Sequence, residues 1–230
     1  MSGSLKKCAL ITGGSNGIGF AIAKKFSENN IEVIIADIKQ PVKEITNVTF
    51  HYCDVSKGDE VNKLYAAIYP LIPDILVLNA GIGIHEHLTE GDPEKWASVL
   101  NINILGVLRC IRAFVPPMEN KKKANVVFIS SVAAKKAYSY GGVYAASKAA
   151  VAMIADTLRI ETKPNIAITT IVAGVTDTAF FNDRTDRDHL FKNCGSLQAK
   201  DIADDVFYAI SQPPGKTINS IMTRPSGQEF

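Results

Sequence analysis

Short apolar runs alternate with helix-forming segments along this chain, and that alternation limits its possible folds more than any other feature. Five runs lack the in-and-out pattern of a strand that faces water on one side: residues 9–11, 33–36, 75–78, 126–129 and 167–172. Helical patterns separate them, over residues 18–28, 59–69, from 92 onward, 143–161 and 200–211. The order predicts a Rossmann-like α/β fold, with a doubly wound parallel sheet and right-handed crossovers.

Two connecting segments carry local signals. Asp92, Pro93 and Glu94 combine a capping residue, a proline at the first helical position and an early acid, so a long helix should begin there. Residues 37–47 leave little room for a helix and include Pro41, which favours a loop or a single turn. With 230 residues and no repeat or linker, we expect a single domain over residues 1–230.

The composition excludes several classes of protein. A net charge of +2 gives no reason to expect nucleic acid or an anionic membrane as a partner. The cysteines lie far apart without metal-ligand spacing, which favours reduced thiols in a cytoplasmic protein. His85 and His87 lack further ligands, so we expect no metal site. No signal-peptide pattern is seen, and no apolar stretch reaches the ~20 residues of a membrane span.

A glycine-rich segment, Thr12 to Gly19, joins the first apolar run to the first helical pattern. Glycines permit a tight turn and close approach of backbone N–H groups to a pyrophosphate, and the helix N-terminus adds partial positive charge. We expect nucleotide contacts from the following residues: Gly13, Ser15, Asn16, Gly17, Ile18 and Gly19. The alternative is a strand-to-helix turn that binds no ligand.

Asp37 ends the second predicted strand, eighteen residues beyond Gly19. An acid there accepts hydrogen bonds from ribose hydroxyls and repels the 2′-phosphate of NADP, which favours NAD. Lys39 would soften that repulsion, and Asp37 could instead cap a loop. Asp54, with Val55, follows the next apolar run and is a candidate for the adenine amino group, although a surface turn is the simpler interpretation.

Tyr144 and Lys148 are one helical turn apart, and Ser131 lies thirteen residues before the tyrosine. A free phenol has a pKa of about 10 and is a poor base at neutral pH. An ammonium group about 4 Å away contributes roughly 4 kcal/mol at an effective dielectric of 20, enough to lower the pKa by about three units. This pair therefore predicts proton transfer at an alcohol or carbonyl, and NADP-linked or NAD-linked hydride transfer fits the glycine-rich segment.

At this point the chain resembles the short-chain dehydrogenase/reductase family in its shorter, single-domain form, over essentially its whole length. The motifs that carry the resemblance are Thr12-x-x-x-Gly-Ile-Gly, Asn79-Ala80-Gly81, Asn103, Ser131, Tyr144-x-x-x-Lys148 and residues 174–178. Two positions depart from the family pattern, because Leu78 replaces a usual asparagine and Ala173 replaces a usual proline before Gly174.

The resemblance implies a role for each matching residue. Tyr144 would be the general acid/base and Ser131 would hydrogen-bond the substrate oxygen. Lys148 would hold the nicotinamide ribose, and Asn103 would help to order a proton-relay water. The remaining cofactor contacts implied are Asn79, Ala80, Gly81, Gly174, Val175 and Thr178, the last with the nicotinamide carboxamide. Residues 179–197 would form a small substrate lid, and the protein would be a homodimer or homotetramer.

We therefore expect an oxidoreductase that transfers a hydride between NAD(H) and a secondary alcohol or ketone. One alternative is an NADP-dependent carbonyl reductase with the same catalytic residues. The other is a nucleotide-binding redox sensor without turnover, against which the intact set Asn103, Ser131, Tyr144 and Lys148 argues. The identity of the small-molecule substrate does not follow from this fold, which serves many substrate classes.

Overall fold

The computed structural model describes residues 6–180 and 194–229. Its centre is a parallel sheet of seven strands in the order β3-β2-β1-β4-β5-β6-β9. The strands are β1 (Cys8–Thr12), β2 (Glu32–Asp37), β3 (Val48–Tyr52), β4 (Ile75–Leu78), β5 (Ala124–Ser131), β6 (Ile166–Ala173) and β9 (Ser220–Thr223). The strand order changes direction between β1 and β4, and in such sheets ligands bind at the carboxyl ends beside this switch point.

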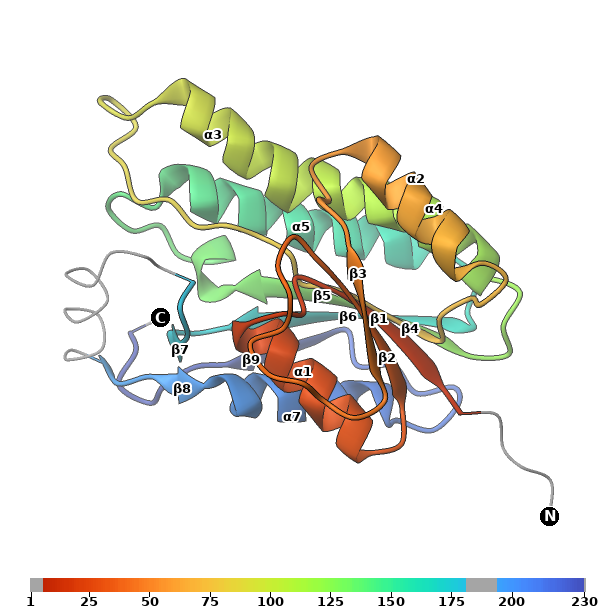
Figure 1. Ribbon diagram of the computed structural model, residues 1–230. Helices are drawn as coiled ribbons and strands as arrows, with labels where there is room; N and C mark the ends of the chain where they lie inside the picture. The colour runs from red at the N-terminus through yellow and green to blue at the C-terminus, as the bar shows by residue number, and fades with distance from the viewer. Residues whose placement is uncertain (1–5, 181–193, 230) are drawn as a thin grey trace, which may run out of the picture.

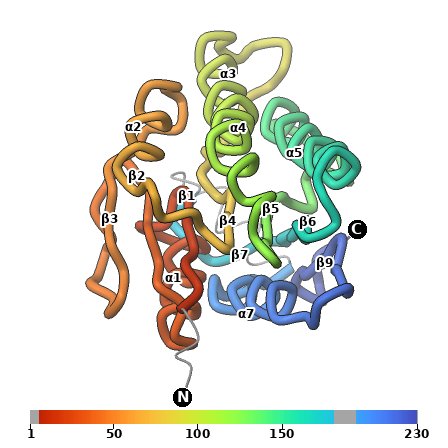
Figure 2. The backbone as a smooth tube through the Cα atoms, turned by 90° about the vertical axis from the view of Figure 1, so that its right-hand side faces the viewer, coloured from red at the N-terminus to blue at the C-terminus, as the bar shows by residue number. Residues whose placement is uncertain are grey.

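Helices cover both faces of the sheet, as Figures 1 and 2 show. One face carries α2 (Gly58–Ile68), α3 (Pro93–Leu100), α4 (Val107–Met118) and α5 (Gly142–Glu161). The other carries α1 (Gly17–Glu28) and α7 (Ala199–Ile210). Each interface holds its own apolar cluster, with Phe114 and Phe128 in the first and Phe26 in the second. The Rossmann-like doubly wound sheet predicted from the sequence is therefore confirmed.

The central strands are buried because both faces are covered. All residues of β1 and β4 are buried, and this explains their unbroken apolar runs. The segment between β2 and β3 contains turns and no helix, as Pro41 predicts. The sequence pattern did not assign β9, whose residues alternate between exposed and half-buried at the sheet edge. A small second sheet pairs β7 (Thr176–Asp177) with β8 (Leu197–Gln198).

The long helix predicted to begin at Asp92 does so, because the Asp92 side chain accepts the N–H of Glu94 and Pro93 occupies the first turn. It continues from α3 through a π-helical segment, η1 (Asn101–Gly106), into α4. Within residues 6–180 and 194–229 this is the one helix with the length and composition to cross a membrane. Such helices also occur in the cores of soluble proteins, and here Val107, Cys110 and Phe114 are buried in the fold.

Most of the expected lid, residues 181–193, lies outside the described residues. The described ends of that segment, at Phe180 and at Cys194 to Leu197, border the carboxyl ends of the strands.

Candidate active site

A cavity of about 710 Å³ opens at the carboxyl ends of the strands, beside the switch point between β1 and β4. Every residue expected at the site from the sequence lines this cavity except Ser15, Gly19 and Asn103. Those three lie behind its wall and hold neighbouring segments in place. The fold therefore brings residues from distant parts of the sequence to one chamber.

The glycine-rich loop is shaped by close backbone approaches. Gly13 and Gly17 have φ angles of +64° and +54°, which residues with a Cβ rarely adopt. A Cβ on Gly19 would lie 2.2 Å from the carbonyl oxygen of Gly13. Asn16 caps α1, since its side-chain oxygen accepts the N–H of Gly17 at 2.7 Å. The first N–H groups of α1 consequently face the cavity with the partial positive charge of a helix N-terminus.

Asp37 stands at the end of β2 and lines the cavity near this loop. Its carboxylate accepts the backbone N–H of Ser15 at 3.0 Å and that of Lys39 at 3.2 Å. The Ser15 hydroxyl donates to the carbonyl of Lys39 at 2.5 Å, which ties the two loops together. Asp37 thus caps a loop and faces the cavity at once, so the two interpretations made from the sequence are compatible.

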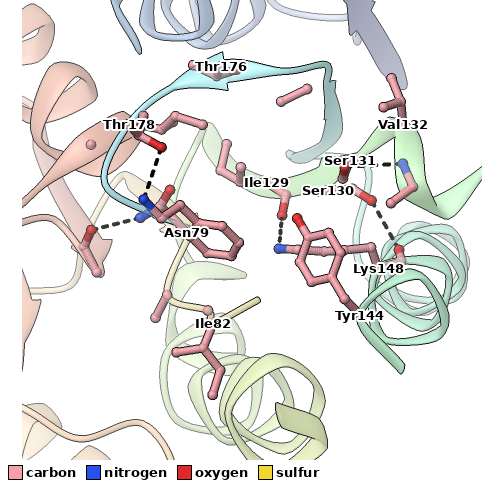
Figure 3. A pocket seen from close by; sticks show the side chains of 18 of the residues that line it. Asn79, Ile82, Ile129, Ser130, Ser131, Val132, Tyr144, Lys148, Thr176 and Thr178 are labelled. Carbon is pink, nitrogen blue, oxygen red and sulfur yellow. Dashed lines mark hydrogen bonds between the residues drawn. The ribbon is translucent and has the colours of Figure 1, made fainter. Parts of the chain in front are cut away.

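Asn79 fastens β4 to the glycine-rich loop. Its side-chain amide donates to the carbonyls of Thr12 at 3.0 Å and Gly13 at 2.8 Å, and its backbone N–H donates to the Thr12 hydroxyl. A Cβ on Gly13 would lie 2.8 Å from the Cα of Ala80. Asn79 and Ala80 therefore fix the floor of the cavity, and Figure 3 shows Asn79 there.

Asp54 and Val55 form a turn on the opposite wall. The Asp54 carboxylate accepts the N–H of Ser56 at 2.9 Å. On α4, Arg109 donates to the Val55 carbonyl at 3.2 Å and to the Asn101 side chain at 2.9 Å. A half-buried arginine on the long helix therefore supports this turn from behind.

Tyr144 and Lys148 enter the cavity from the same face of α5, and Figure 3 shows them opposite the end of β5. Lys148 donates to the Ile129 carbonyl at 2.9 Å, and its ammonium nitrogen lies 5.8 Å from the centroid of the Tyr144 ring. The phenol is hydrogen-bonded to the Ser131 side chain. Ser130 also lines the cavity, but its hydroxyl donates to the Lys148 carbonyl at 3.0 Å. The thirteen-residue spacing thus selected the serine that contacts the tyrosine.

Burial controls the titration of both groups in the ligand-free chain. Loss of solvent lowers the pKa of Lys148 from 10.5 to about 8. It raises the pKa of Tyr144 above 10, and the Ser131 hydrogen bond offsets only part of the increase. The sequence predicted a phenol pKa lowered by the lysine, which is the wrong direction for this ligand-free state. The prediction assumed a fully charged ammonium about 4 Å away and ignored desolvation.

Asn103 does not point into the cavity. Its side chain accepts the N–H of Ile82 at 2.9 Å and donates to the Ile82 carbonyl and the Ser147 hydroxyl. The Ser147 hydroxyl in turn donates to the Tyr144 carbonyl at 2.7 Å. Asn103 therefore connects η1 to the loop after β4 and to the helix turn that carries the tyrosine.

Other cavity residues lie outside the set of predicted site residues. Phe180 lies 5.7 Å from Tyr144 between ring centroids, and His85 meets Tyr138 edge to face at 6.0 Å. From the C-terminal tail, Gln228 and Glu229 also line the cavity. No motif marks these residues, because their positions depend on how separate loops fold together. The described residues hold no cluster of three or more potential metal ligands among His, Cys, Asp and Glu.

Comparison with known proteins places this geometry in a family. Residues 7–189 match the short chain dehydrogenase family model. An uncharacterized oxidoreductase of Staphylococcus saprophyticus is 33% identical, with 95% of this chain and 97% of the relative covered. A similar relative from Staphylococcus haemolyticus is 31% identical, again over 95% and 97% of the two chains.

Solved structures share the fold. The closed form of a serine dehydrogenase complexed with NADP⁺ superposes with a TM-score of 0.89 at 25% identity, over 97% of this chain and 96% of that one. An aldohexose dehydrogenase from Thermoplasma acidophilum, in ligand-free form, has a TM-score of 0.86 at 21% identity, over 95% and 92%. With its Gly-rich loop, buried Tyr-Lys pair and parallel sheet, this oxidoreductase chain belongs to the short-chain dehydrogenase/reductase family.

Proposed function

We propose that this protein interconverts a secondary alcohol and a ketone, using a nicotinamide dinucleotide and Tyr144 as the general acid/base. One observation carries the proposal. The phenol of Tyr144 is buried in the cavity, hydrogen-bonded to Ser131, with Lys148 on the same helix face. The Tyr144 phenol can donate a proton to the substrate oxygen or accept one from it, and the Ser131 hydroxyl beside it can hydrogen-bond the same oxygen.

The chain's residues fit the dinucleotide. The cavity of about 710 Å³ falls within the range of roughly 300–1,000 Å³ typical of ligand pockets. A positive-φ glycine loop and a helix N-terminus at one end suit a pyrophosphate. The bound dinucleotide supplies the hydride acceptor for oxidation or the donor for reduction. Residues that would hold it are Gly13, Asn16, Gly17, Ile18, Asp37, Asp54, Val55, Ala80, Gly81, Lys148, Gly174, Val175 and Thr178.

Four residues would act indirectly. Ser15 positions Asp37, Gly19 gives α1 its close approach to the loop, and Asn79 secures β4. Asn103 would support catalysis from behind Tyr144, through Ser147 and Ile82. Ser15, Gly19 and Asn103 lie behind the cavity wall, whereas Asn79 lines the cavity and directs its side-chain amide to the glycine-rich loop.

In the ligand-free chain the protonated phenol of Tyr144 favours the direction in which a carbonyl is reduced. With its pKa raised by burial, Tyr144 carries its proton at neutral pH and can donate it to a carbonyl oxygen. In the alcohol-oxidising direction the phenol must first lose that proton. Lys148 stabilises the phenolate by its field only while it is itself protonated, below its pKa of about 8.

We propose NAD as the preferred cofactor, because the Asp37 carboxylate faces the adenosine end of the cavity and would repel a 2′-phosphate. A second candidate is an NADP-dependent carbonyl reductase. It is favoured by the two N–H groups that neutralise part of the Asp37 charge, by nearby Lys39 and by the NADP⁺ complex of the similar serine dehydrogenase. Relative affinities for NADH and NADPH separate the two.

The experiment that tests the function is a substrate screen with purified protein. NAD and NADP are each offered with secondary alcohols, hydroxy acids, polyols and dihydrodiols, and reduced-nicotinamide absorbance is followed. We expect turnover that disappears in Tyr144→Phe. Dinucleotide binding without turnover on any substrate would favour a non-catalytic redox sensor, and absence of dinucleotide binding would refute both.

We also propose a cytoplasmic homodimer or homotetramer. Supporting this, Leu105 on η1 and Leu108 on α4 are 46% and 40% exposed, and Met153 on α5 is 65% exposed. Exposed apolar side chains on adjoining helices are a common feature of association surfaces. Light scattering after gel filtration tests the assembly, and a monomer at micromolar concentration would contradict it.

A further inference from the structure

The C-terminal tail enters the cavity at its catalytic end, where no sequence motif placed it. Residues Gly227, Gln228 and Glu229 line the same chamber as Tyr144. The tail follows β9, which pairs with β6 through Ala173 and Thr223. It is therefore anchored beside the turn that leaves β6, at Gly174 to Thr176.

Ala173 and Gly174 at the start of that turn both leave φ free, and Gly174 is the most permissive residue of all. Inside the turn, the Thr176 hydroxyl donates to the Gly174 carbonyl at 2.9 Å. Partners from elsewhere in the chain also hold the turn. Gly174 donates to the Thr223 carbonyl at 2.7 Å, and the Val175 carbonyl accepts the N–H of Leu197 at 2.8 Å.

Gln228 supplies a further contact to the backbone of the turn. Its side-chain oxygen accepts the N–H of Val175 at 3.0 Å. The approach is tight, since a Cβ on Gly174 would lie 2.5 Å from that oxygen and 2.6 Å from the Cβ of Arg224. Hydrogen bonds within the tail hold its shape, because the Arg224 guanidinium donates to the carbonyls of Pro225 and Gln228. The Gln228 N–H also donates to the Pro225 carbonyl at 3.0 Å.

We propose that Gln228 is a positioning residue for the nicotinamide half of the cofactor. It fixes the peptide between Gly174 and Val175, which borders the cavity at the end opposite Asp37. The inference rests on the proposed function, because it needs a dinucleotide whose nicotinamide end lies beside Tyr144. Ordering the turn before binding lowers the entropy lost when the nicotinamide is held.

The test compares two ligands on three proteins. Wild type, Gln228→Met and Gln228→Glu are titrated with the preferred reduced dinucleotide and with its ADP-ribose portion, which lacks the nicotinamide ring. Methionine keeps the length of the side chain without a strong acceptor, whereas glutamate keeps an acceptor oxygen. Thermal melting of each variant checks folding.

We expect Gln228→Met to bind the dinucleotide about fivefold more weakly, the usual effect of one lost hydrogen bond, and to bind the ADP-ribose portion as wild type does. Gln228→Glu should restore dinucleotide affinity to within about twofold. Equal dinucleotide affinity in all three proteins would overturn the inference, as would equal weakening of both ligands. If wild type binds neither ligand, the proposed function itself fails, which is a distinct result.

Discussion

The two ends of the cavity are built on different plans. The end proposed for adenosine takes its loop and its acid from residues 12–37, in which the glycine-rich loop joins β1 to α1 and Asp37 ends β2, and Asp54 and Val55 add the opposite wall. The catalytic end gathers side chains from β5, α5, the turn after β6 and the C-terminal tail. One end is thus specified by local backbone chemistry, and the other by tertiary packing of distant segments.

The largest expected effect separates chemistry from cofactor binding. Tyr144→Phe should reduce turnover by about 10²–10⁴-fold, because the general acid/base is lost while the ring remains. Dinucleotide affinity should change little, since the adenosine end is untouched. Initial rates and fluorescence titration measure the two quantities. Tyr138→Phe is the matched control, because Tyr138 also lines the cavity and this variant should keep most of the turnover. An equal loss of turnover in both variants would contradict the role of Tyr144 as the general acid/base.

A second variant, Gly19→Ala, changes only the glycine-rich loop and tests its contribution to dinucleotide binding. In Gly19→Ala the new Cβ would lie 2.2 Å from the Gly13 carbonyl oxygen, so the loop must shift. We expect this strain to weaken dinucleotide binding by about 1–3 kcal/mol, roughly 5- to 150-fold. The control is Gly58→Ala in the first turn of α2, where the nearest atom would be 3.9 Å away. Wild-type affinity in Gly19→Ala would show that this close approach is unimportant.

A pH experiment probes the burial at the catalytic end. Lys148 loses its proton near pH 8 in the folded chain and near 10.5 when unfolded, so the unfolded state binds more protons between these values. The Lys148 contribution to stability should therefore rise by about 2 kcal/mol from pH 8 to about 10. The buried thiols of Cys8, Cys53 and Cys110 act oppositely in both wild type and variant, because burial raises their pKa values, so the lysine contribution is read as the difference between the two proteins. Above about 10 the raised pKa of Tyr144 acts oppositely, because the unfolded phenol deprotonates first.

Lys148→Met should remove this rise. Urea unfolding of wild type and variant from about pH 7 to about pH 10 gives the difference at each pH. Parallel stability curves for the two proteins would mean that Lys148 keeps an ordinary pKa in the folded state.

The smallest effect concerns cofactor choice. Asp37→Ser removes the carboxylate and keeps a hydroxyl beside the N–H groups of Ser15 and Lys39. We expect the ratio of NADPH to NADH affinity to increase by about tenfold, because one repulsive charge is gone. Asp54→Ser, on the opposite wall, is the control. An unchanged ratio in Asp37→Ser would place the discrimination elsewhere.

The same contrast explains what the sequence could predict. Local signals located the loop, the start of the long helix and the buried strands, because each depends on neighbouring residues. The Ile129 carbonyl that holds Lys148 and the Gln228 contact with Val175 depend on strand register and on the path of the tail. The direction of the Tyr144 pKa shift depends on burial, which no spacing reveals.

Segment η1 links the two ends. Asn101 and Asn103 are two residues apart, so their side chains leave the helix in nearly opposite directions. Asn101 joins Arg109 and the Ser56 carbonyl on the adenine side, whereas Asn103 holds Ile82 on the catalytic side. The segment acts as a strut between two walls of a chamber. Because Asn101 and Asn103 belong to one segment, a displacement of η1 would carry the Ser56 turn and the Ile82 loop with it, so the two walls would move together.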